Sequence, residues 1–266
     1  MFKKILICVL VIIGFAMPTI FSRAATSDVT IGGGVVIGAS NLVNGMAPIA
    51  RVHYYHAYPS STVSVATSTS GDLFIASYSS SAIDVSSGTI SDTLGNSWHF
   101  MSYFENGNQT LSNWYAANII GSSSPDSVTV SSTDNGDPGL TVTEYSGIST
   151  STPFFNSACN SVSTNSSPNS YTWMGNEQTS TTPNQLWYSS WASEVTTATS
   201  WNTPFTAIQN DTNHADTQAD DLNVPYPGSP TASVNINALS GHVALICEAS
   251  FNAASSTNPF STVTIR

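Results

Sequence analysis

The chain has 266 residues, of which 40% are hydrophobic and only 8% are charged, and its net charge is −11 at pH 7. Soluble domains usually contain about 25% charged residues, so we expect a folded protein with a neutral, hydroxyl-rich surface. Its basic residues are Lys3, Lys4, Arg23, Arg51 and Arg266. They are too few and too scattered to neutralise a phosphate backbone or to hold an anionic membrane surface, which excludes nucleic acid as a partner.

Residues 1–24 are typical of a secretory signal peptide. Lys3 and Lys4 form a basic start, residues 5–17 are apolar, and residues 22–24 are a small-residue cleavage site. The apolar run is shorter than the about 20 residues that cross a bilayer. We therefore expect cleavage before Ala25, a secreted or cell-surface location, and no membrane span after cleavage.

Beyond the leader, apolar residues alternate with polar ones or form short runs between clusters of Ser, Thr, Asn, Gly and Pro. This pattern is typical of β-strands joined by turns. In chain order, the predicted strands cover residues 50–58, 72–79, 97–104, 111–119, 127–131, 140–145, 185–192, 231–236 and 242–251. The segment 156–170 reads as a surface loop or a linker. No internal repeat of fixed period is visible in the sequence.

These elements predict an all-β, two-layer antiparallel β-sandwich of the jelly-roll or immunoglobulin-like type. We expect one domain at 48–252, with an N-terminal arm at 25–47 and a C-terminal arm at 253–266. The runs 29–37 and 260–265 within the arms are apolar and β-prone. We expect them to pair with edges of their own sandwich; addition to a neighbouring molecule's sheet is the alternative.

Cysteine usage predicts a disulfide. Cys8 would leave with the leader, and Cys159 and Cys247 would remain as an even pair in an oxidising compartment. Two separate buried thiols are the alternative.

Tryptophan is concentrated in the second half of the chain. Trp187 and Trp191 would point the same way on one strand, about 13 Å apart, and an exposed pair of this kind can stack on successive sugar rings. The alternative is that the indoles fill the sandwich core. The carbohydrate-binding candidates are Trp173, Trp187, Trp191 and Trp201.

The sequence contains two carboxylate sites that could bind a metal ion or take part in catalysis. The first offers oxygen ligands for Ca²⁺ but lacks the glycine and closing Glu of an EF-hand, so a solvated loop is the alternative; its members are Asp211, Asp216, Asp220 and Asp221. No other cofactor is predicted. The second is Glu144, which ends an apolar strand face. We expect it to be bonded to backbone or paired with Arg51 rather than to be catalytic.

Five blocks, in this order, resemble a largely uncharacterised β-sandwich module of secreted and cell-surface bacterial proteins. They are GDLFIASY from Gly71, ISDTLGNSWHF from Ile90, LSNWYAANIIGSS from Leu111, LTVTEYSGIS from Leu140 and VALICEASF from Val243. PNQLWYSS from Pro183 resembles a further strand of the same family, whereas Ala117 stands where the family has a basic residue. The resemblance implies a displayed module and transfers no catalytic residue.

The sequence lacks the GxSxG, HExxH and SxxK signatures of nucleophilic and zinc hydrolases. It also lacks the paired carboxylates along one strand that many sandwich glycosidases carry. We therefore expect a non-catalytic recognition or adhesive module that binds a glycan or another cell-surface component. The alternatives are a structural component that self-associates through its strand arms, and a glycosidase-like enzyme.

Overall fold

The computed structural model describes residues 28–31, 35–38, 48–81, 88–106, 109–131, 136–163, 170–174, 184–193, 198–210, 216–224, 232–237 and 243–255. The chain forms two compact units, Met1–Gly45 with Thr257–Arg266, and Met46–Ser256. In the first unit, β1 (Asp28–Ile31) pairs with β2 (Val35–Gly38) in an antiparallel hairpin. The N-terminal arm was expected to pair with a sandwich edge, and its described strands instead pair with each other. The run 260–265 lies outside the described residues.

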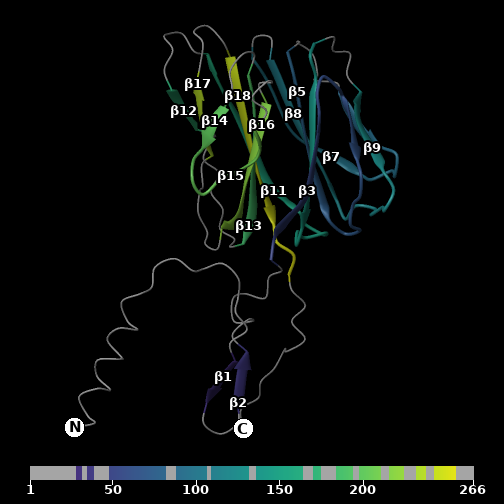
Figure 1. Cartoon of the computed structure of the whole chain (residues 1–266), viewed down its shortest axis with the longest axis vertical. Helices are drawn as coiled ribbons and strands as arrows, with labels where there is room; N and C mark the ends of the chain where they lie inside the picture. Colours follow the sequence, from purple (N-terminus) through teal and green to yellow (C-terminus); the bar gives the residue numbers. More distant parts are fainter. Residues whose placement is uncertain are drawn as a thin grey trace, which may run out of the picture. The chain divides into compact units, whose positions relative to one another are not determined.

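The second unit begins with eight strands that form two antiparallel sheets (Figure 1). The inner sheet has the order β3-β10-β5-β8-β7 and the outer sheet has the order β4-β9-β6. The first strand lies beside the last, as in a jelly roll. The strands are β3 (Ala50–Ala57), β4 (Thr62–Val65), β5 (Leu73–Ser80), β6 (Thr89–Asp92), β7 (Trp98–Asn106), β8 (Gln109–Ala117), β9 (Asp126–Ser131) and β10 (Gly139–Ser146).

Eight further strands repeat this topology. The inner sheet is β11-β18-β13-β16-β15 and the outer sheet is β12-β17-β14, so each strand of the first half has a counterpart eight elements later. The strands are β11 (Phe154–Ser163), β12 (Ser170–Met174), β13 (Gln185–Ser193), β14 (Ala198–Trp201), β15 (Thr206–Asn210), β16 (Asp216–Val224), β17 (Ser233–Asn237) and β18 (Val243–Asn252). The predicted antiparallel β-sandwich is confirmed, and it is built twice within one compact unit.

Backbone details repeat as well. Gly71 has a φ of 92° two residues before Leu73, and Asn184 has a φ of 56° two residues before Leu186. Positive φ is uncommon outside glycine, and Asn tolerates it best among ordinary residues. The two halves therefore enter their central strands β5 and β13 through the same unusual backbone conformation.

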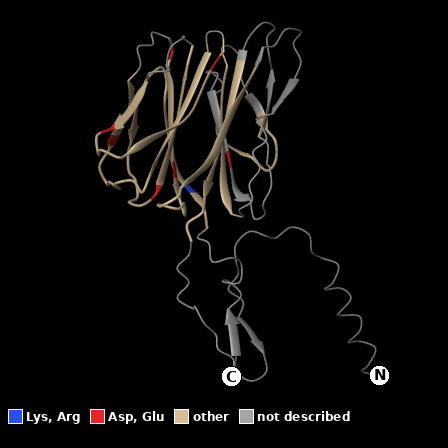
Figure 2. Ribbon diagram, turned by 180° about the vertical axis from the view of Figure 1, so that it is seen from behind, with Lys and Arg blue, Asp and Glu red and all other residues tan. Residues whose placement is uncertain are grey.

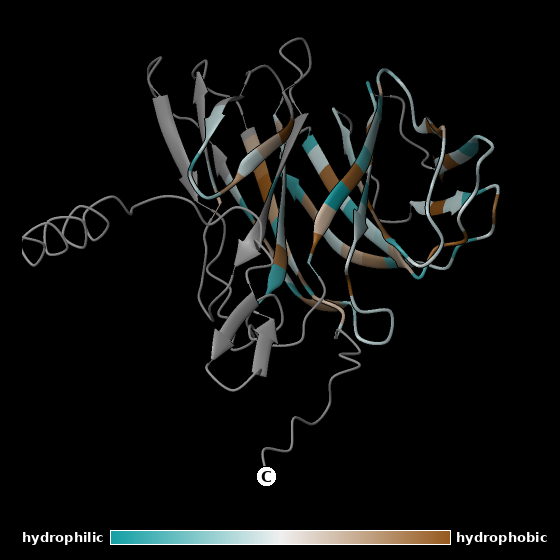
Figure 3. Ribbon diagram, turned by 60° about the horizontal axis from the view of Figure 1, so that its bottom comes forward, coloured by the Kyte–Doolittle hydropathy of each residue, from teal (hydrophilic) through white to brown (hydrophobic). Residues whose placement is uncertain are grey.

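The two five-stranded sheets pack face to face at the centre of the unit (Figure 1). Their shared core contains apolar side chains from both halves: Leu73, Ile75, Met101, Tyr145, Ile148, Leu186, Tyr188, Ile208, Ala249 and Phe251. In the first half, the opposite face of the inner sheet is covered by β4-β9-β6 around a second core that includes Val65, Phe74, Trp114 and Val128. The residues of the central strands β5 and β13 are thus almost all buried, on both faces. Figure 3 shows hydrophobic and hydrophilic residues alternating along several strands of the unit.

A buried polar network crosses the interface between the halves. The Asn113 side-chain oxygen accepts hydrogen bonds from the hydroxyls of Ser77, at 2.6 Å, and Ser190, at 3.0 Å. Its amide nitrogen donates to the hydroxyl of Ser102 at 3.0 Å. Ser77 and Ser190 each lie four residues after the matching leucines of β5 and β13. One fully buried amide therefore joins equivalent positions of both halves and fixes how their sheets align.

We expect the Asn113→Ala variant to lose about 2 to 3 kcal/mol of unfolding free energy, because the substitution removes three buried hydrogen bonds and leaves the hydroxyls of Ser102 and Ser190 without this partner, whereas Ser77 keeps its contact with Tyr188. Urea unfolding measures this loss. Adding Ser77→Ala and Ser190→Ala to the same chain should recover part of it, since the hydroxyl of Ser190 is then no longer buried without a partner. A triple variant whose losses simply add would show that the network contributes no coupling.

The predicted disulfide is confirmed. Cys159 on β11 and Cys247 on β18 face each other in the antiparallel ladder and form an S–S bond across 88 residues of sequence. The part of the chain that the structure describes contains no helix long and apolar enough to cross a membrane.

Candidate functional site

The first half carries an open depression of about 480 Å³ at the ends of its strands. Hydroxyl side chains and one glycine line it: Thr67, Ser68, Thr69, Ser70, Gly121, Ser122 and Ser123. These residues belong to two short segments, one between β4 and β5 and the other between β8 and β9. We call them the 67–70 rim and the 121–123 rim. All but one of the lining residues carry a hydroxyl and none is charged, while most of the exposed surface of the depression is apolar.

Backbone contacts hold the two rims together. Ser68 and Ser122 exchange two N–H···O hydrogen bonds, at 2.9 and 3.0 Å. A Cβ atom at Gly121 would lie only 2.2 Å from the backbone nitrogen of Ser70. Glycine is therefore required at position 121, because the rims approach more closely there than any side chain allows.

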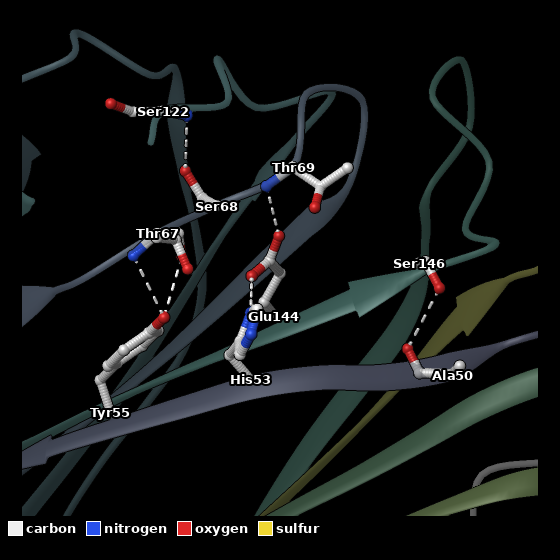
Figure 4. Close-up of polar contacts among 9 residues, drawn as sticks. All are labelled: Ala50, His53, Tyr55, Thr67, Ser68, Thr69, Ser122, Glu144 and Ser146. Carbon is white, nitrogen blue, oxygen red and sulfur yellow. Dashed lines mark hydrogen bonds and ion pairs between the residues drawn. The ribbon is translucent and has the colours of Figure 1, made fainter. Parts of the chain in front are cut away.

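A buried glutamate anchors the 67–70 rim (Figure 4). Glu144, on β10, is fully buried, and its Oε1 atom accepts a hydrogen bond from the backbone N–H of Thr69 at 2.6 Å. Its Oε2 atom lies 2.8 Å from Nδ1 of His53 on β3. The expected bond of Glu144 to backbone is confirmed, but its expected partner Arg51 is wrong, since His53 takes that place. Oε1 of Glu144 thus holds the rim, and Oε2 is occupied by His53.

A tyrosine on β3 also contacts the 67–70 rim. Tyr55, two residues after His53 on the same strand face, donates its hydroxyl to the carbonyl of Thr67 at 2.9 Å. The backbone N–H of Thr67 lies 3.4 Å from the same oxygen. Tyr55 therefore holds Thr67 directly, whereas His53 reaches Thr69 only through Glu144.

A second carboxyl lies next to Glu144. The pKa of Asp72 is raised from 3.8 to about 6, chiefly by burial and then by the charge of the neighbouring Glu144, while His53 lowers it. The backbone of Asp72 is also part of the rim structure, because its carbonyl accepts from Ile119 at 3.1 Å and its N–H donates to Thr69 at 3.3 Å. Asp72 thus titrates near neutral pH while its backbone joins both segments.

The second half shows that the fold does not require titratable residues at the positions of Glu144 and His53. In the ladder of β10 with β3, the register shifts directly after the Glu144–His53 pair. The ladder of β18 with β11 shifts at the same place, directly after the Ser250–Asn156 pair. The same topology is therefore built there with uncharged residues at the positions of the glutamate and the histidine.

Asp72, like Glu144 and His53, has an uncharged counterpart in the second half. Asp72 comes directly after the positive-φ residue Gly71, and its counterpart after Asn184 is Gln185. His53, Asp72 and Glu144 together thus form an acidic and basic cluster found at these positions in one half only.

Charged residues are sparse on the described part of the unit (Figure 2). Its basic side chain Arg51 lies 3.6 Å from Asp220, which is fully buried and also accepts a hydrogen bond from the Tyr145 hydroxyl at 2.8 Å. This contact joins β3 and β10 of the first half to β16 of the second. Arg51 is therefore committed to the interface between the halves and supplies no positive charge to the depression.

The structure corrects the predicted tryptophan platform. Trp187 and Trp191 are both completely buried, on the face of β13 opposite the shared core. They are interior residues of the second half and present no ring surface to a sugar. Trp201 is half-buried at the end of β14, and the side chain of Trp173 on β12 lies outside the described residues.

Three of the four predicted calcium ligands lie on a strand. Asp216, Asp220 and Asp221 belong to strand β16 rather than to a loop, and Asp220 is paired with Arg51. Asp211 and the side chains of Asp216 and Asp221 lie outside the described residues. Among the described residues, no group of three or more His, Cys, Asp or Glu side chains is arranged to hold a metal ion.

Two of the quoted sequence blocks have local structural explanations. Asp92 in the ISDTLGNSWHF block accepts hydrogen bonds from the backbone N–H groups of Gly95 and Asn96 and from the indole of Trp98. Gly147 in the LTVTEYSGIS block has a φ of 78°, and a Cβ atom there would lie 2.1 Å from the Pro48 carbonyl. These residues shape turns, whereas Glu144 in the same block holds the rim.

Sequence reasoning did not find the depression, because its lining residues are ordinary serines and threonines in a chain rich in both. No protein-family model and no curated protein matches this chain.

Proposed function

We propose that the protein is a secreted, non-catalytic recognition module that binds a neutral, hydroxyl-rich glycan across the depression between its two rims. The observation that carries the proposal is the hydroxyl-lined depression whose backbone is fixed from beneath by a buried carboxylate. Hydroxyls and backbone amides supply the paired donors and acceptors that sugar hydroxyls require. A prearranged rim also reduces the entropy lost when a ligand orders it.

Charge favours a neutral ligand over an anionic one. The whole chain carries −11, and Arg51 is already paired with Asp220. Sulfated, phosphorylated or uronic-acid glycans would meet a repulsive field without a cation in the lining to offset it. The open form of the depression suits a polymer that lies across it.

The carboxylate geometry argues for binding rather than for glycoside hydrolysis. Glycosidases place two carboxyls about 5 to 9.5 Å apart, on either side of the bond that they cleave. Glu144 uses one oxygen to hold Thr69 and the other to contact His53, and it is fully buried. Glu144 is therefore committed to supporting the rim.

A glycan array of neutral and anionic glycans, probed with the purified protein, tests the proposal. We expect binding to one or more neutral glycans, and a loss of tenfold or more in affinity in the Gly121→Ala variant, whose added Cβ must push the rims apart. The Ser91→Ala variant, on the exposed face of β6, should bind as the wild type does. Circular dichroism and thermal unfolding check that both variants fold. Exclusive binding of anionic glycans, or unchanged binding by a folded Gly121→Ala variant, would contradict the proposal.

A further inference from the structure

Large apolar side chains lie on the surface beside the 121–123 rim. Ile120, the residue before Gly121, is 51% exposed. Phe100 on β7 is 61% exposed, the largest fraction among the large hydrophobic side chains that the structure describes. Trp98, two residues before Phe100 on the same face of β7, is half-buried. We call Ile120, Trp98 and Phe100 the apolar strip.

Hydrogen bonds join the apolar strip to the rim. The backbone N–H of Ile120 donates to Oδ1 of Asn96 at 2.6 Å. Asp92 accepts from the backbone N–H of Asn96 at 3.0 Å and from the indole N–H of Trp98 at 2.7 Å. Phe100 lies two strand residues beyond Trp98, which is about 7 Å. The strip therefore starts at the rim, runs along β7 and keeps a fixed position relative to the depression.

Buried aromatic residues support the strip from beneath. The ring of Trp98 stacks on Phe74 with 6.2 Å between the ring centroids, and Phe100 contacts Trp114 edge to face at 6.2 Å. Phe74 and Trp114 belong to the core of the first half. The ring of Phe100 is thus held against the core while most of its surface faces solvent. A ring held in this way loses little freedom when a ligand covers it.

The second half shows that the fold does not require a large side chain at position 100. The ladder of β7 with β8 shifts register directly after Phe100, and the ladder of β15 with β16 shifts directly after Ala207. The next residues, Met101 and Ile208, both pack in the shared core, so Phe100 and Ala207 occupy matching positions. An alanine therefore fills the place that an exposed aromatic ring takes in the first half.

We infer that the apolar strip is a second contact region for the glycan, onto which a chain bound in the depression extends. This inference rests on the proposed function for its ligand and on the strip for the second region. Aromatic rings and aliphatic side chains pack against the apolar faces of sugar rings, while the sugar hydroxyls at the edges remain hydrated. A glycan of several rings would cover both regions, and a short one would cover the depression alone.

Charge favours a neutral occupant here as well. The side chains of the strip are uncharged, and the neighbouring Asp92 uses both of its oxygens to bind the turn and Trp98. His99, between Trp98 and Phe100, faces the other side of the sheet, where it stacks on Tyr115 with 5.1 Å between the ring centroids. The strip thus supplies apolar contact and no ion pair, which suits a neutral sugar chain.

Isothermal titration calorimetry of the full protein tests the second region with the disaccharide and the hexasaccharide of a neutral glycan found on the array. Phe100→Leu keeps an apolar side chain but loses the ring, so it should bind the hexasaccharide at least fivefold more weakly and the disaccharide as the wild type does. Phe100→Tyr keeps the ring and should bind both as the wild type does. The matched control is Phe155→Leu, at the 39% exposed Phe155 on β11, and it should change neither affinity. Circular dichroism and thermal unfolding check that each variant folds.

The outcomes separate this inference from the proposed function. Hexasaccharide affinity that is unchanged in Phe100→Leu, while Gly121→Ala weakens binding of both lengths, would overturn the inference and leave the proposed function standing. If a folded Gly121→Ala variant binds as the wild type does while Phe100→Leu loses affinity for the hexasaccharide, the depression fails as the site and the second region stands. Light scattering that shows self-association of the wild type, abolished in Phe100→Leu, would assign the strip to a second copy of the chain and would also overturn the inference.

Discussion

The unfolding free energy should fall by up to about 4 kcal/mol between pH 5 and pH 8, and most of this fall should disappear in the Glu248→Gln variant. Glu248, on β18, is 1% exposed. Burial raises its pKa from an ordinary value of 4.5 to about 8, and the hydrogen bond that it accepts from the backbone of Ala232 opposes only part of that rise. The neutral acid is therefore the form that fits the interior of the second half.

The direction of the effect follows from where the proton resides. Between pH 4.5 and pH 8 the folded chain keeps a proton on Glu248 that the unfolded chain releases. Stability is therefore greatest below the unfolded pKa and declines as the pH rises toward the folded pKa. Asp72 contributes in the same direction over a lower window, from 3.8 to about 6.

Urea unfolding at several pH values measures the decline, and the difference between wild type and variant isolates the buried acid from general charge repulsion. Glutamine keeps the shape and the acceptor for Ala232 but cannot ionise. The exposed Glu105→Gln variant on β7 removes a charge without burial and should decline as the wild type does. If the unfolding free energies of the wild type and of Glu248→Gln fell by the same amount between pH 5 and pH 8, ionisation of Glu248 would not cause the decline, and the prediction would be wrong.

The central strands could be predicted from the sequence because burial on both faces produces short apolar runs. The predicted strands at 72–79, 140–145, 185–192 and 242–251 coincide with β5, β10, β13 and β18 to within two residues. The missed strands have mixed or polar sequences. β11 contains Asn, Ser and Cys at an edge of its sheet, a composition that predicts a loop, and the aspartates of β16 likewise predict an acidic loop.

The duplication of the fold could not be predicted, since the halves share topology and very little sequence. The matching positions before β5 and β13 hold Gly71 and Asn184, which are related only through their backbone conformation. The predicted strands also omit β11, β12, β14, β15 and β16, which hid the equal number of strands in each half. The sequences GDL (71–73) and NQL (184–186) lead into the two central strands. They could have been matched by looking for residues that tolerate a positive φ at the same distance before a leucine.

The candidate site was predicted only in part. Glu144 was singled out at a strand end and its backbone bond was expected, whereas its partners His53 and Asp72 come from other strands and only the fold brings them together. The predicted exposure of the tryptophans is wrong. Alternation along a strand shows which residues share a face of the sheet, but it does not show whether other strands cover that face. Trp187 and Trp191 share a face as expected, and that face points into the second half.

Removal of the disulfide should cost roughly 4 to 5 kcal/mol of unfolding free energy, because the bond closes a long loop in the unfolded chain. Urea unfolding of the wild type and of a Cys159→Ala, Cys247→Ala double variant measures this cost. Cys247 packs with Leu111, Ala192 and Leu245, so alanine at this position also removes a sulfur from a well-packed core. The double variant should therefore lose at least as much as the loop-closure value.

The loss should concentrate at the edge strand β11, which the bond joins to β18. Hydrogen exchange of β11 amides should accelerate more than that of β3, its counterpart in the first half, because β3 is held by the Arg51–Asp220 and Tyr55–Thr67 contacts instead. A reductant should bring the wild type close to the stability of the double variant and leave the variant unchanged. Two thiols that react with an alkylating reagent in the native, unreduced protein, or equal exchange in the two strands, would contradict this account, in which the disulfide does for one half what polar contacts do for the other.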